Sequence, residues 1–359
     1  MYFVFALLAG HQRRKARDCE PMKTIVVNVL KMSIVGLLLW WMVASGKLSW
    51  EPLAVFLRRP DAIFASVVIW VVGPLFLGTL RWWLLIQGAG LQCRYFYAMK
   101  LQTIGYFFNT AMPGAVGGDI VKAIYIVKSQ GGAAAKTPAM VTVVLDRIVG
   151  LIGLFLMSVV TASFSYQQLS QNPVIVQLMT GLGIVVVLSI VFLTMVFIPY
   201  KNRPDPIAKI LAYRMPGFTI LSRIYAALRT YRERPWIILG TIALSVVLQV
   251  VFLWYLGFIG RILYGDEAFD PSLLAPIFPF GILATAIPLA PGGMGVGHAV
   301  FERLFALVGL PGGANVFNAY ALSQLVLNLL GFIPYLALKK QGPKAGFDRS
   351  QVEDMAATI

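Results

Sequence analysis

Apolar runs of about twenty residues recur along this chain, and an α-helix needs about that length to cross the hydrocarbon core of a bilayer. These runs lie at 25–45, 62–82, 138–164, 174–199, 236–260 and 314–338. The chain is 58% hydrophobic and only 13% charged, which is about half the charged fraction of a soluble domain. We therefore predict an all-α polytopic membrane protein with about six full transmembrane helices. A soluble enzyme, a secreted disulfide scaffold and a disordered chain are excluded.

The positive charge of the chain is concentrated between the apolar runs. Lys and Arg number 30 against 15 Asp and Glu, a formal charge of +15, and no basic and aromatic motif for nucleic-acid binding accompanies them. Lys and Arg that flank membrane helices tend to stay on the cytoplasmic side. The loop 200–235 and both termini are therefore predicted to be cytoplasmic. The acidic loop 265–270 is predicted to lie outside.

Two further apolar stretches, 95–128 and 272–309, are each interrupted by a cluster of Pro and Gly. The arm after each break is too short to cross a bilayer alone, and irregular backbone at membrane depth needs protein or a wet cavity to satisfy it. We predict two re-entrant helical hairpins, the first entering from the cytoplasm and the second from outside. The units that contain them would have opposite orientation. This is an inverted repeat, in which a binding site forms near the bilayer midplane.

One transmembrane domain is expected at 22–340, because no polar segment is large enough to form a soluble catalytic domain. Residues 1–21 form a basic extension, and the ordinary start of a membrane helix at Met22 favours a translation start there. Residues 341–359 are expected to form a cytoplasmic tail.

The first Pro-Gly break carries a motif suited to binding an anion. Its candidate binding residues are Asn109, Pro113, Gly114, Gly117, Gly118, Asp119 and Lys122. The glycines let the backbone approach a ligand, and the arm after them begins a helix whose free N–H groups and positive dipole end favour a phosphate. Lys122 lies one turn beyond Asp119 and shares its face. Asp119 could instead cap this helix in a purely structural role.

Asp146 and Arg147 are adjacent charges inside the third full apolar run. Neighbours in a helix point about 100° apart, so these two should pair with other helices and not with each other. Asp119 is the expected partner of Arg147. Arg81 or Lys122 is the expected partner of Asp146. The result is either a structural buried ion network or a cavity in which Arg147 meets a phosphate.

The second break carries a glycine cluster followed by two ionisable residues. Its candidate binding residues are Pro291, Gly292, Gly293, Gly295, His298 and Glu302. His298 and Glu302 share a helix face at i, i+4 spacing, and they form either a neutral hydrogen-bonded pair or a protonatable pair coupled to transport. The chain has only two His, and Cys19 and Cys93 show no metal-ligand spacing and no disulfide framework. We expect no metal and no other cofactor.

Gln324 and Asn328 lie one turn apart in the last apolar run, next to Ser323. Such side chains either make hydrogen bonds between helices or line a cavity. The chain shows no nucleophile–base triad and no phosphate-binding G-x-x-x-x-G-K-[ST] loop. We therefore expect no enzymatic activity, and transport that is passive or driven by a gradient.

Four motifs follow one another along the chain. They are Arg81-Trp82, N-x-x-x-P-G-x-x-G-G-D at 109–119, D-R-x-x-G at 146–150 and P-x-x-P-G-G-x-G-V at 288–296. Together, over about 25–340, they resemble the flippase-like transmembrane domain of lysylphosphatidylglycerol synthases, a family with stand-alone members that lack the synthase domain. The resemblance implies lipid translocation in a bacterial inner membrane, without aminoacylation of the lipid. Lys122 stands where the family often has Arg, and His298 where it often has an acidic residue, so the headgroup stays open.

The principal hypothesis is a lipid flippase. The two hairpin tips would meet near the midplane, and Arg81, Lys122 and Arg147 would hold the phosphate of a membrane lipid, which we expect to be an anionic phospholipid. One alternative is a proton-coupled secondary transporter of a small polar solute that uses Asp119 and the ionisable pair of the second break. The other is an enzyme or accessory subunit acting on a modified lipid, for which the sequence offers no clear catalytic cluster.

Overall fold

The computed structural model describes most of the chain from residue 50 onward. The described residues are 50–111, 117–130, 135–164, 166–197, 228–287 and 295–339, with the single positions 40, 44, 222, 225, 226 and 293. Every regular element in these ranges is a helix, and this confirms the predicted all-α fold. Most of the predicted span 25–45 and most of the basic loop 200–235 lie outside the described residues.

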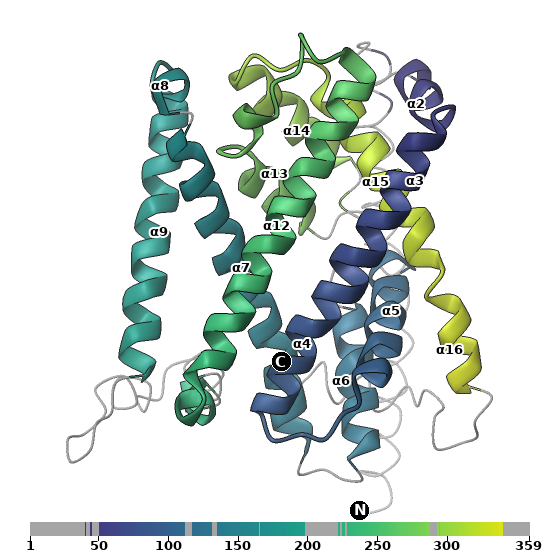
Figure 1. The fold of residues 1–359 in the computed structure, drawn as a ribbon, viewed down its shortest axis with the longest axis vertical. Helices are drawn as coiled ribbons and strands as arrows, with labels where there is room; N and C mark the ends of the chain where they lie inside the picture. Colours follow the sequence, from purple (N-terminus) through teal and green to yellow (C-terminus); the bar gives the residue numbers. More distant parts are fainter. Residues whose placement is uncertain are drawn as a thin grey trace, which may run out of the picture.

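The helices follow one another along a single bundle (Figure 1). In chain order they are α2 (Trp50–Leu57), α3 (Pro60–Trp70), η1 (Val71–Leu77), α4 (Gly78–Gly88), α5 (Tyr95–Ala111), α6 (Gly117–Ser129), α7 (Lys136–Phe164), α8 (Tyr166–Leu169), α9 (Pro173–Phe197), η3 (Tyr231–Glu233), α12 (Pro235–Tyr264), η4 (Pro271–Leu274), α13 (Phe278–Thr285), α14 (Val296–Leu307), α15 (Gly313–Leu329) and α16 (Phe332–Lys339).

Five helical segments of the described chain are long and apolar enough to cross a membrane. They are Pro60–Gly88, Lys136–Phe164, Pro173–Met195, Pro235–Tyr264 and Gly313–Leu338. Each coincides with one of the six predicted spans, with ends that differ by a few residues. Apolar run length was therefore a sufficient signal for these spans.

The first long helix is continuous from Pro60 to Gly88 although it contains Pro74. A proline inside a helix removes one hydrogen-bond donor and clashes with the preceding turn. The chain accommodates it through η1, which is a π-helix and therefore has a wider turn. The hydroxyl of Tyr106 in α5 donates a hydrogen bond to the carbonyl oxygen of Pro74 at 2.9 Å. This hydrogen bond links the π-helical segment to the neighbouring helix α5.

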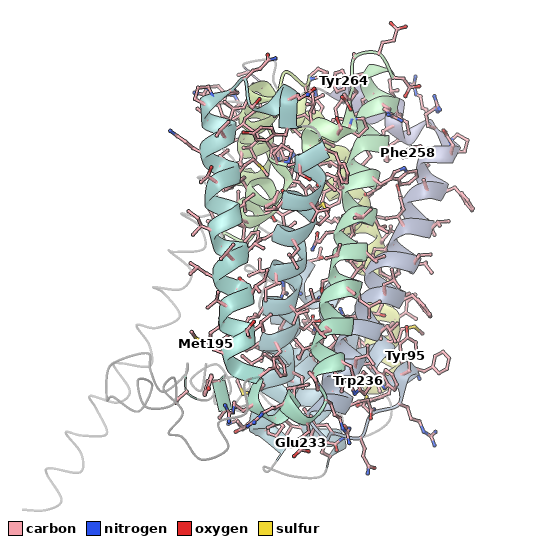
Figure 2. The ribbon with its side chains drawn as sticks, turned by 60° about the vertical axis from the view of Figure 1, so that its left-hand side comes forward. Tyr95, Met195, Glu233, Trp236, Phe258 and Tyr264 are labelled. Atoms are coloured by element: carbon pink, nitrogen blue, oxygen red, sulfur yellow. The ribbon has the colours of Figure 1, made fainter. Side chains whose placement is uncertain are left out.

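The outer faces of the long helices are apolar. On α9, for example, Ile184, Val187 and Leu188 are 56%, 58% and 62% exposed. Large exposed apolar faces are rare on soluble monomers, whereas lipid tails cover them in a membrane. Figure 2 shows aromatic residues near both ends of the bundle, with Trp236 at one end and Tyr264 at the other. Aromatic side chains concentrate at the two interfaces of a bilayer, so the bundle has the surface of a multi-pass membrane protein.

The two interrupted stretches form helix pairs in opposite halves of the molecule. α5 and α6 lie in the lower half of Figure 1, and α13 and α14 lie in the upper half. Each pair has its own core, with Trp82 and Leu101 in the first and Phe278 and Phe301 in the second. This placement agrees with hairpins that enter from opposite sides. Their re-entrant character and the symmetry of an inverted repeat stay predictions.

Helices α7 and α12 cross the middle of the bundle and pack closely against each other. A Cβ atom at Gly153 of α7 would overlap the side chain of Ser245 in α12. Small residues allow helix backbones to approach closely in membranes, where packing rather than apolar burial drives association. This close crossing brings the middle of α7, with its two adjacent charges, next to the middle of α12.

Candidate functional site

Five charged side chains form a buried network among α4, α6 and α7. They are Arg81, Asp119, Lys122, Asp146 and Arg147. At a rise of about 1.5 Å per residue, Asp146 lies about 15 Å from the start of the 29-residue helix α7. Charges at this depth of a transmembrane helix are costly and need partners. We call this set the charge network, and it is the candidate site.

Asp119 is the centre of the charge network. Its Oδ1 lies 3.0 Å from Nζ of Lys122, and its Oδ2 accepts a hydrogen bond of 2.7 Å from Nε of Arg147. The predicted pairing with Arg147 is therefore confirmed. Asp119 sits in the first turn of α6, where a negative charge also interacts well with the helix dipole. Asn109 pairs one of the free N–H groups at the start of this helix, since its Oδ1 accepts a hydrogen bond of 2.7 Å from the Gly118 N–H.

The second ion pair joins Arg81 of α4 to Asp146 of α7. Nε of Arg81 donates to Oδ1 of Asp146 at 2.7 Å, and Nη1 of the same guanidinium donates to Oγ of Ser245 at 3.1 Å. Of the two partners expected for Asp146, Arg81 is therefore the correct one. Gly150 makes room for the guanidinium, because a Cβ there would lie 3.2 Å from Nη1 of Arg81. This explains the glycine of the D-R-x-x-G motif.

Lys122 is enclosed by protein on several sides. Besides Asp119, its ammonium group donates to Oε1 of Gln102 at 3.1 Å and lies 4.8 Å from the centre of the Trp82 ring. The amide of Gln102 continues the network to the hydroxyl of Tyr106 at 2.7 Å. A lysine with a carboxylate, an amide and an aromatic face around it is well satisfied. Only 5% of its side chain is exposed.

Arg147 differs from the other members of the charge network in its exposure. Its side chain is 52% exposed, against 8% for Asp119 and 13% for Arg81. The three cations also outnumber the two carboxylates, which leaves the charge network with a formal charge of +1. The network therefore combines largely buried charges with one half-exposed arginine side chain.

The ionisable residues of the second hairpin do not form the expected pair. Nδ1 of His298 accepts from the Gly295 N–H at 3.2 Å, and its Nε2 lies 3.4 Å from Oδ1 of Asn318. Glu302 instead accepts from the Ala314 N–H at 3.0 Å. This N–H is one of the unpaired donors at the start of α15, so Glu302 caps that helix. The i, i+4 spacing placed both residues on one face, but tertiary partners separate them.

Gln324 and Asn328 belong to the contact between α15 and two other helices. Asn328 accepts from Nε1 of Trp70 at 2.9 Å and donates to Oγ1 of Thr110 at 3.1 Å. It therefore makes the interhelical hydrogen bonds that the sequence left open as one alternative. The Nε2 atom of Gln324 is buried and has no hydrogen-bond partner among the described residues.

Some candidate residues cannot be placed in the site. Pro113, Gly114, Pro291 and Gly292 lie outside the described residues. The expected meeting of the two hairpin tips falls on these same segments and stays a prediction. Within the described part of the chain, no hydrogen bond or ion pair joins His298 to the charge network.

Sequence reasoning missed Gln102 and Ser245 as members of the site. Both are polar residues within apolar helices, and polar side chains in such segments usually face protein and make interhelical hydrogen bonds. That signal marks them as candidates. It does not indicate which cation each one contacts.

The fold and the buried charge network define a multi-pass helical membrane protein with ionisable groups at the middle of its spans. The chain belongs to the lysylphosphatidylglycerol synthase TM region family, because the model of that family matches residues 28–332. The match covers most of the chain and confirms the resemblance seen in the four motifs. No curated protein and no solved structure matches the chain significantly.

Proposed function

We propose that this protein moves a phospholipid between the two leaflets of its membrane and receives the lipid phosphate at Arg147. The family to which the chain belongs supports a role connected with membrane lipids. The observation that carries the proposal is the half-exposed side chain of Arg147, whose Nε is bonded near the middle of a membrane helix to the buried carboxylate of Asp119. A cation that is accessible at this depth suits a ligand that arrives through the membrane.

The charge balance of the network favours an anionic group as the ligand. Among the five members of the charge network, three cations face two carboxylates, and net charge at the centre of a bilayer is costly. A phosphate next to Arg147 would neutralise the excess. A guanidinium carries five N–H donors in a planar fork that matches phosphate oxygens.

Arg81 and Lys122 have a different role in this proposal from the one the sequence suggested. Both are largely buried and bonded to protein groups, with Arg81 on Asp146 and Ser245 and Lys122 on Asp119 and Gln102. We assign them the task of fixing the two carboxylates in position. The lipid phosphate then contacts Arg147 alone among the three cations.

The alternative of proton-coupled solute transport has weaker support. It depended on a protonatable pair in the second hairpin, and His298 and Glu302 bond to separate groups. Glu302 in particular is engaged at the start of α15 and serves the fold. Lipid movement does not require such a pair.

The test is a scrambling assay in liposomes that contain a fluorescent phospholipid and a membrane-impermeant quencher. Wild type and the control Arg234→Ala, an exposed arginine at the start of α12, should move lipid at similar rates. Arg147→Ala should slow the movement by about tenfold or more, since losing a charge-assisted hydrogen bond costs about 1.5–3 kcal/mol.

Thermal unfolding of each variant in detergent serves as the check on folding. The proposal is overturned if wild-type vesicles scramble no faster than protein-free vesicles. It is also overturned if folded Arg147→Ala keeps the wild-type rate, because the phosphate would then be received elsewhere.

A further inference from the structure

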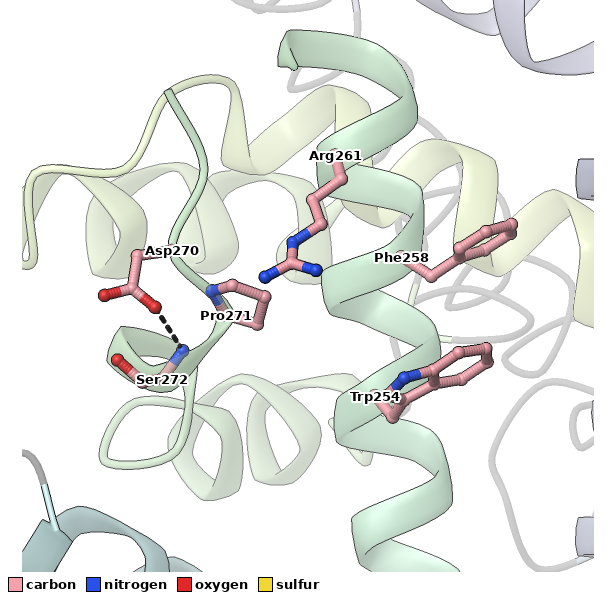
Figure 3. Close-up of a pocket in the computed structure, with 6 residues that line it drawn as sticks. All are labelled: Trp254, Phe258, Arg261, Asp270, Pro271 and Ser272. Carbon is pink, nitrogen blue, oxygen red and sulfur yellow. Dashed lines mark hydrogen bonds between the residues drawn. The ribbon is translucent and has the colours of Figure 1, made fainter. Parts of the chain in front are cut away.

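A cavity lies at the C-terminal end of α12, away from the charge network. One wall is the face of α12 that carries Trp254, Phe258 and Arg261, and the other is the start of η4 with its preceding loop, Asp270, Pro271 and Ser272 (Figure 3). The cavity has a volume of about 350 Å³. This falls at the lower end of the range for small-ligand sites.

This cavity is a separate site. Arg261 follows Ser245, the α12 contact of the charge network, by sixteen residues, which corresponds to about 24 Å along the helix axis. Figure 2 shows Phe258 near the same end of the bundle as Tyr264. Because aromatic residues mark the level of the lipid headgroups, the cavity lies at the membrane interface.

The polar groups of the cavity retain capacity for a ligand. Arg261 is half-exposed, and its Nε lies 3.5 Å from Oδ1 of Asp266, a long ion pair. Its two terminal nitrogens make no hydrogen bond with any described residue, and Figure 3 shows the guanidinium between α12 and Pro271. Asp270 uses Oδ1 to accept from the Ser272 N–H at 2.9 Å. Its Oδ2 makes no hydrogen bond within the described part of the chain.

The aromatic wall continues into an apolar surface that could carry acyl chains. The rings of Trp254 and Phe258 are stacked at 5.5 Å with an interplanar angle of 9°, and Trp254 is 59% exposed. One and two turns earlier on the same helix face lie Val250 and Val247, which are 44% and 48% exposed. A lipid whose headgroup occupied the cavity would therefore find an apolar path beneath it.

The charges around the cavity select the class of headgroup. The lining carries one cation, Arg261, and one carboxylate, Asp270, and a second carboxylate, Asp266, lies 3.5 Å from Arg261. An anionic headgroup would meet net repulsion here. A headgroup with both a phosphate and an ammonium matches the cavity, because Arg261 can bind the phosphate while Asp270 attracts the ammonium.

We propose that this cavity binds the headgroup of a zwitterionic phospholipid of the ethanolamine class from the leaflet at this end of the molecule. The site does not depend on lipid transport through the charge network. It provides a fixed lipid contact at the interface.

The test measures lipid binding to the purified full-length protein by native mass spectrometry, with phosphatidylethanolamine and phosphatidylglycerol of identical acyl chains. Wild type should bind one phosphatidylethanolamine at least about fivefold more tightly than phosphatidylglycerol, given the strength of charge-assisted hydrogen bonds. Arg261→Gln and Asp270→Asn should each remove this preference. Asn can still cap the start of η4, so Asp270→Asn removes only the charge.

Matched controls come from the opposite end of the same helix. Arg234→Gln and Trp236→Phe should keep the preference for phosphatidylethanolamine, whereas Trp254→Leu should weaken it. The two tryptophans are a matched pair because they are almost equally exposed, Trp236 at 61% and Trp254 at 59%. Equal binding of the two lipids by wild type overturns the proposal without any variant. Loss of the preference in Arg234→Gln as much as in Arg261→Gln overturns it as well.

Soluble glycerophosphoethanolamine identifies the source of the ligand. Weak competition by this compound supports a site that needs the acyl chains as well as the headgroup. Competition at the same concentration as the lipid would show a site for a soluble molecule and would contradict the proposal.

Discussion

Asp119 is the residue on which the electrostatics of the site depend most. Each of its carboxylate oxygens is bonded to a different cation, Lys122 within α6 and Arg147 from α7, and its side chain is only 8% exposed. Removing one partner of a buried ion pair leaves an uncompensated charge. This destabilises a protein far more than replacing both partners by apolar residues. At Asp119 a single change would leave two cations without their carboxylate.

We therefore expect Asp119→Asn to lower the free energy of unfolding by about 3–5 kcal/mol, the cost of breaking a buried ion pair. The matched control is Asp61→Asn, which breaks the solvent-exposed pair with Arg59 and should have little effect, since surface ion pairs contribute little. Thermal unfolding in detergent micelles measures both. Similar shifts for the two variants would contradict the assignment of Asp119 as the centre of the charge network.

The sequence supported the pairings at this site but not the full set of contacts. Charges inside an apolar run must find partners, and few candidates existed, so Arg147 was predicted to pair with Asp119 and Asp146 with either Arg81 or Lys122; the structure selects Arg81. The contact of Lys122 with Gln102 depends on how two helices are rotated against each other, which spacing within one helix does not determine. For the same reason, the N–H groups at the start of α15 could not be foreseen as the partner of Glu302.

At the scale of helices, α5 and α6 are held together by a contact between two glycines. A Cβ atom at Gly118 would overlap the carbonyl oxygen of Gly105, while the side chain of Lys122 crosses Gly105 on the same side. The close approach allows Asn109 at the end of α5 to reach the first N–H groups of α6. The position of Asp119 therefore depends on the spacing between the two helices.

Gly118→Ala should force α5 and α6 apart and lower the free energy of unfolding by about 1–3 kcal/mol, the usual cost of overpacking. The matched control is Gly240→Ala in α12, where an added Cβ meets nothing within 4 Å and should slightly stabilise the helix, because Ala has the higher helix propensity. If the contact between Gly118 and Gly105 is as close as described, thermal unfolding should show lower stability for Gly118→Ala and higher stability for Gly240→Ala. Two shifts of the same sign would refute it.

The presence of the long helices could be predicted from the sequence, whereas the local change from α-helix to π-helix could not. Spans such as Lys136–Phe164 and Pro235–Tyr264 follow from apolar length alone. The π-helix around Pro74 had no comparable signal, because proline in an apolar run is equally compatible with a kink or an end. The hydrogen bond from Tyr106 that accompanies it forms only after α5 has packed.

At the scale of the whole molecule, α7 contributes residues to both cores and packs closely against α12 at Gly153. The charge network lies against this contact through Ser245, while the interfacial cavity lies near the end of α12. The same helix thus connects the two proposed lipid sites. For the direction of the bundle in the membrane, the sequence predicts that the α4–α5 loop faces the cytoplasm.

Cys93 provides a test of that direction in a Cys19→Ser background, where it is the only cysteine. It lies in the α4–α5 loop, and burial raises the pKa of its thiol to about 11. Because the thiolate is the reactive form, the rate of labelling by a membrane-impermeant maleimide should rise about tenfold per pH unit between pH 7 and 9, without a plateau. Labelling should occur only from the cytoplasmic side of oriented vesicles, and labelling from the opposite side alone would reverse the predicted topology.

The wide turn at Val71–Leu77 has a geometric consequence for everything that follows it in the first long helix. Each residue of a regular helix rotates the side-chain direction by about 100° about the helix axis. The extra residue of a π turn therefore changes the direction in which all later side chains of the helix point. Arg81 comes only four positions after this segment ends. The number of residues in Val71–Leu77 therefore determines that the guanidinium of Arg81 points toward Asp146. Deleting one residue from this segment would turn Arg81 away from Asp146, although every other residue stayed the same.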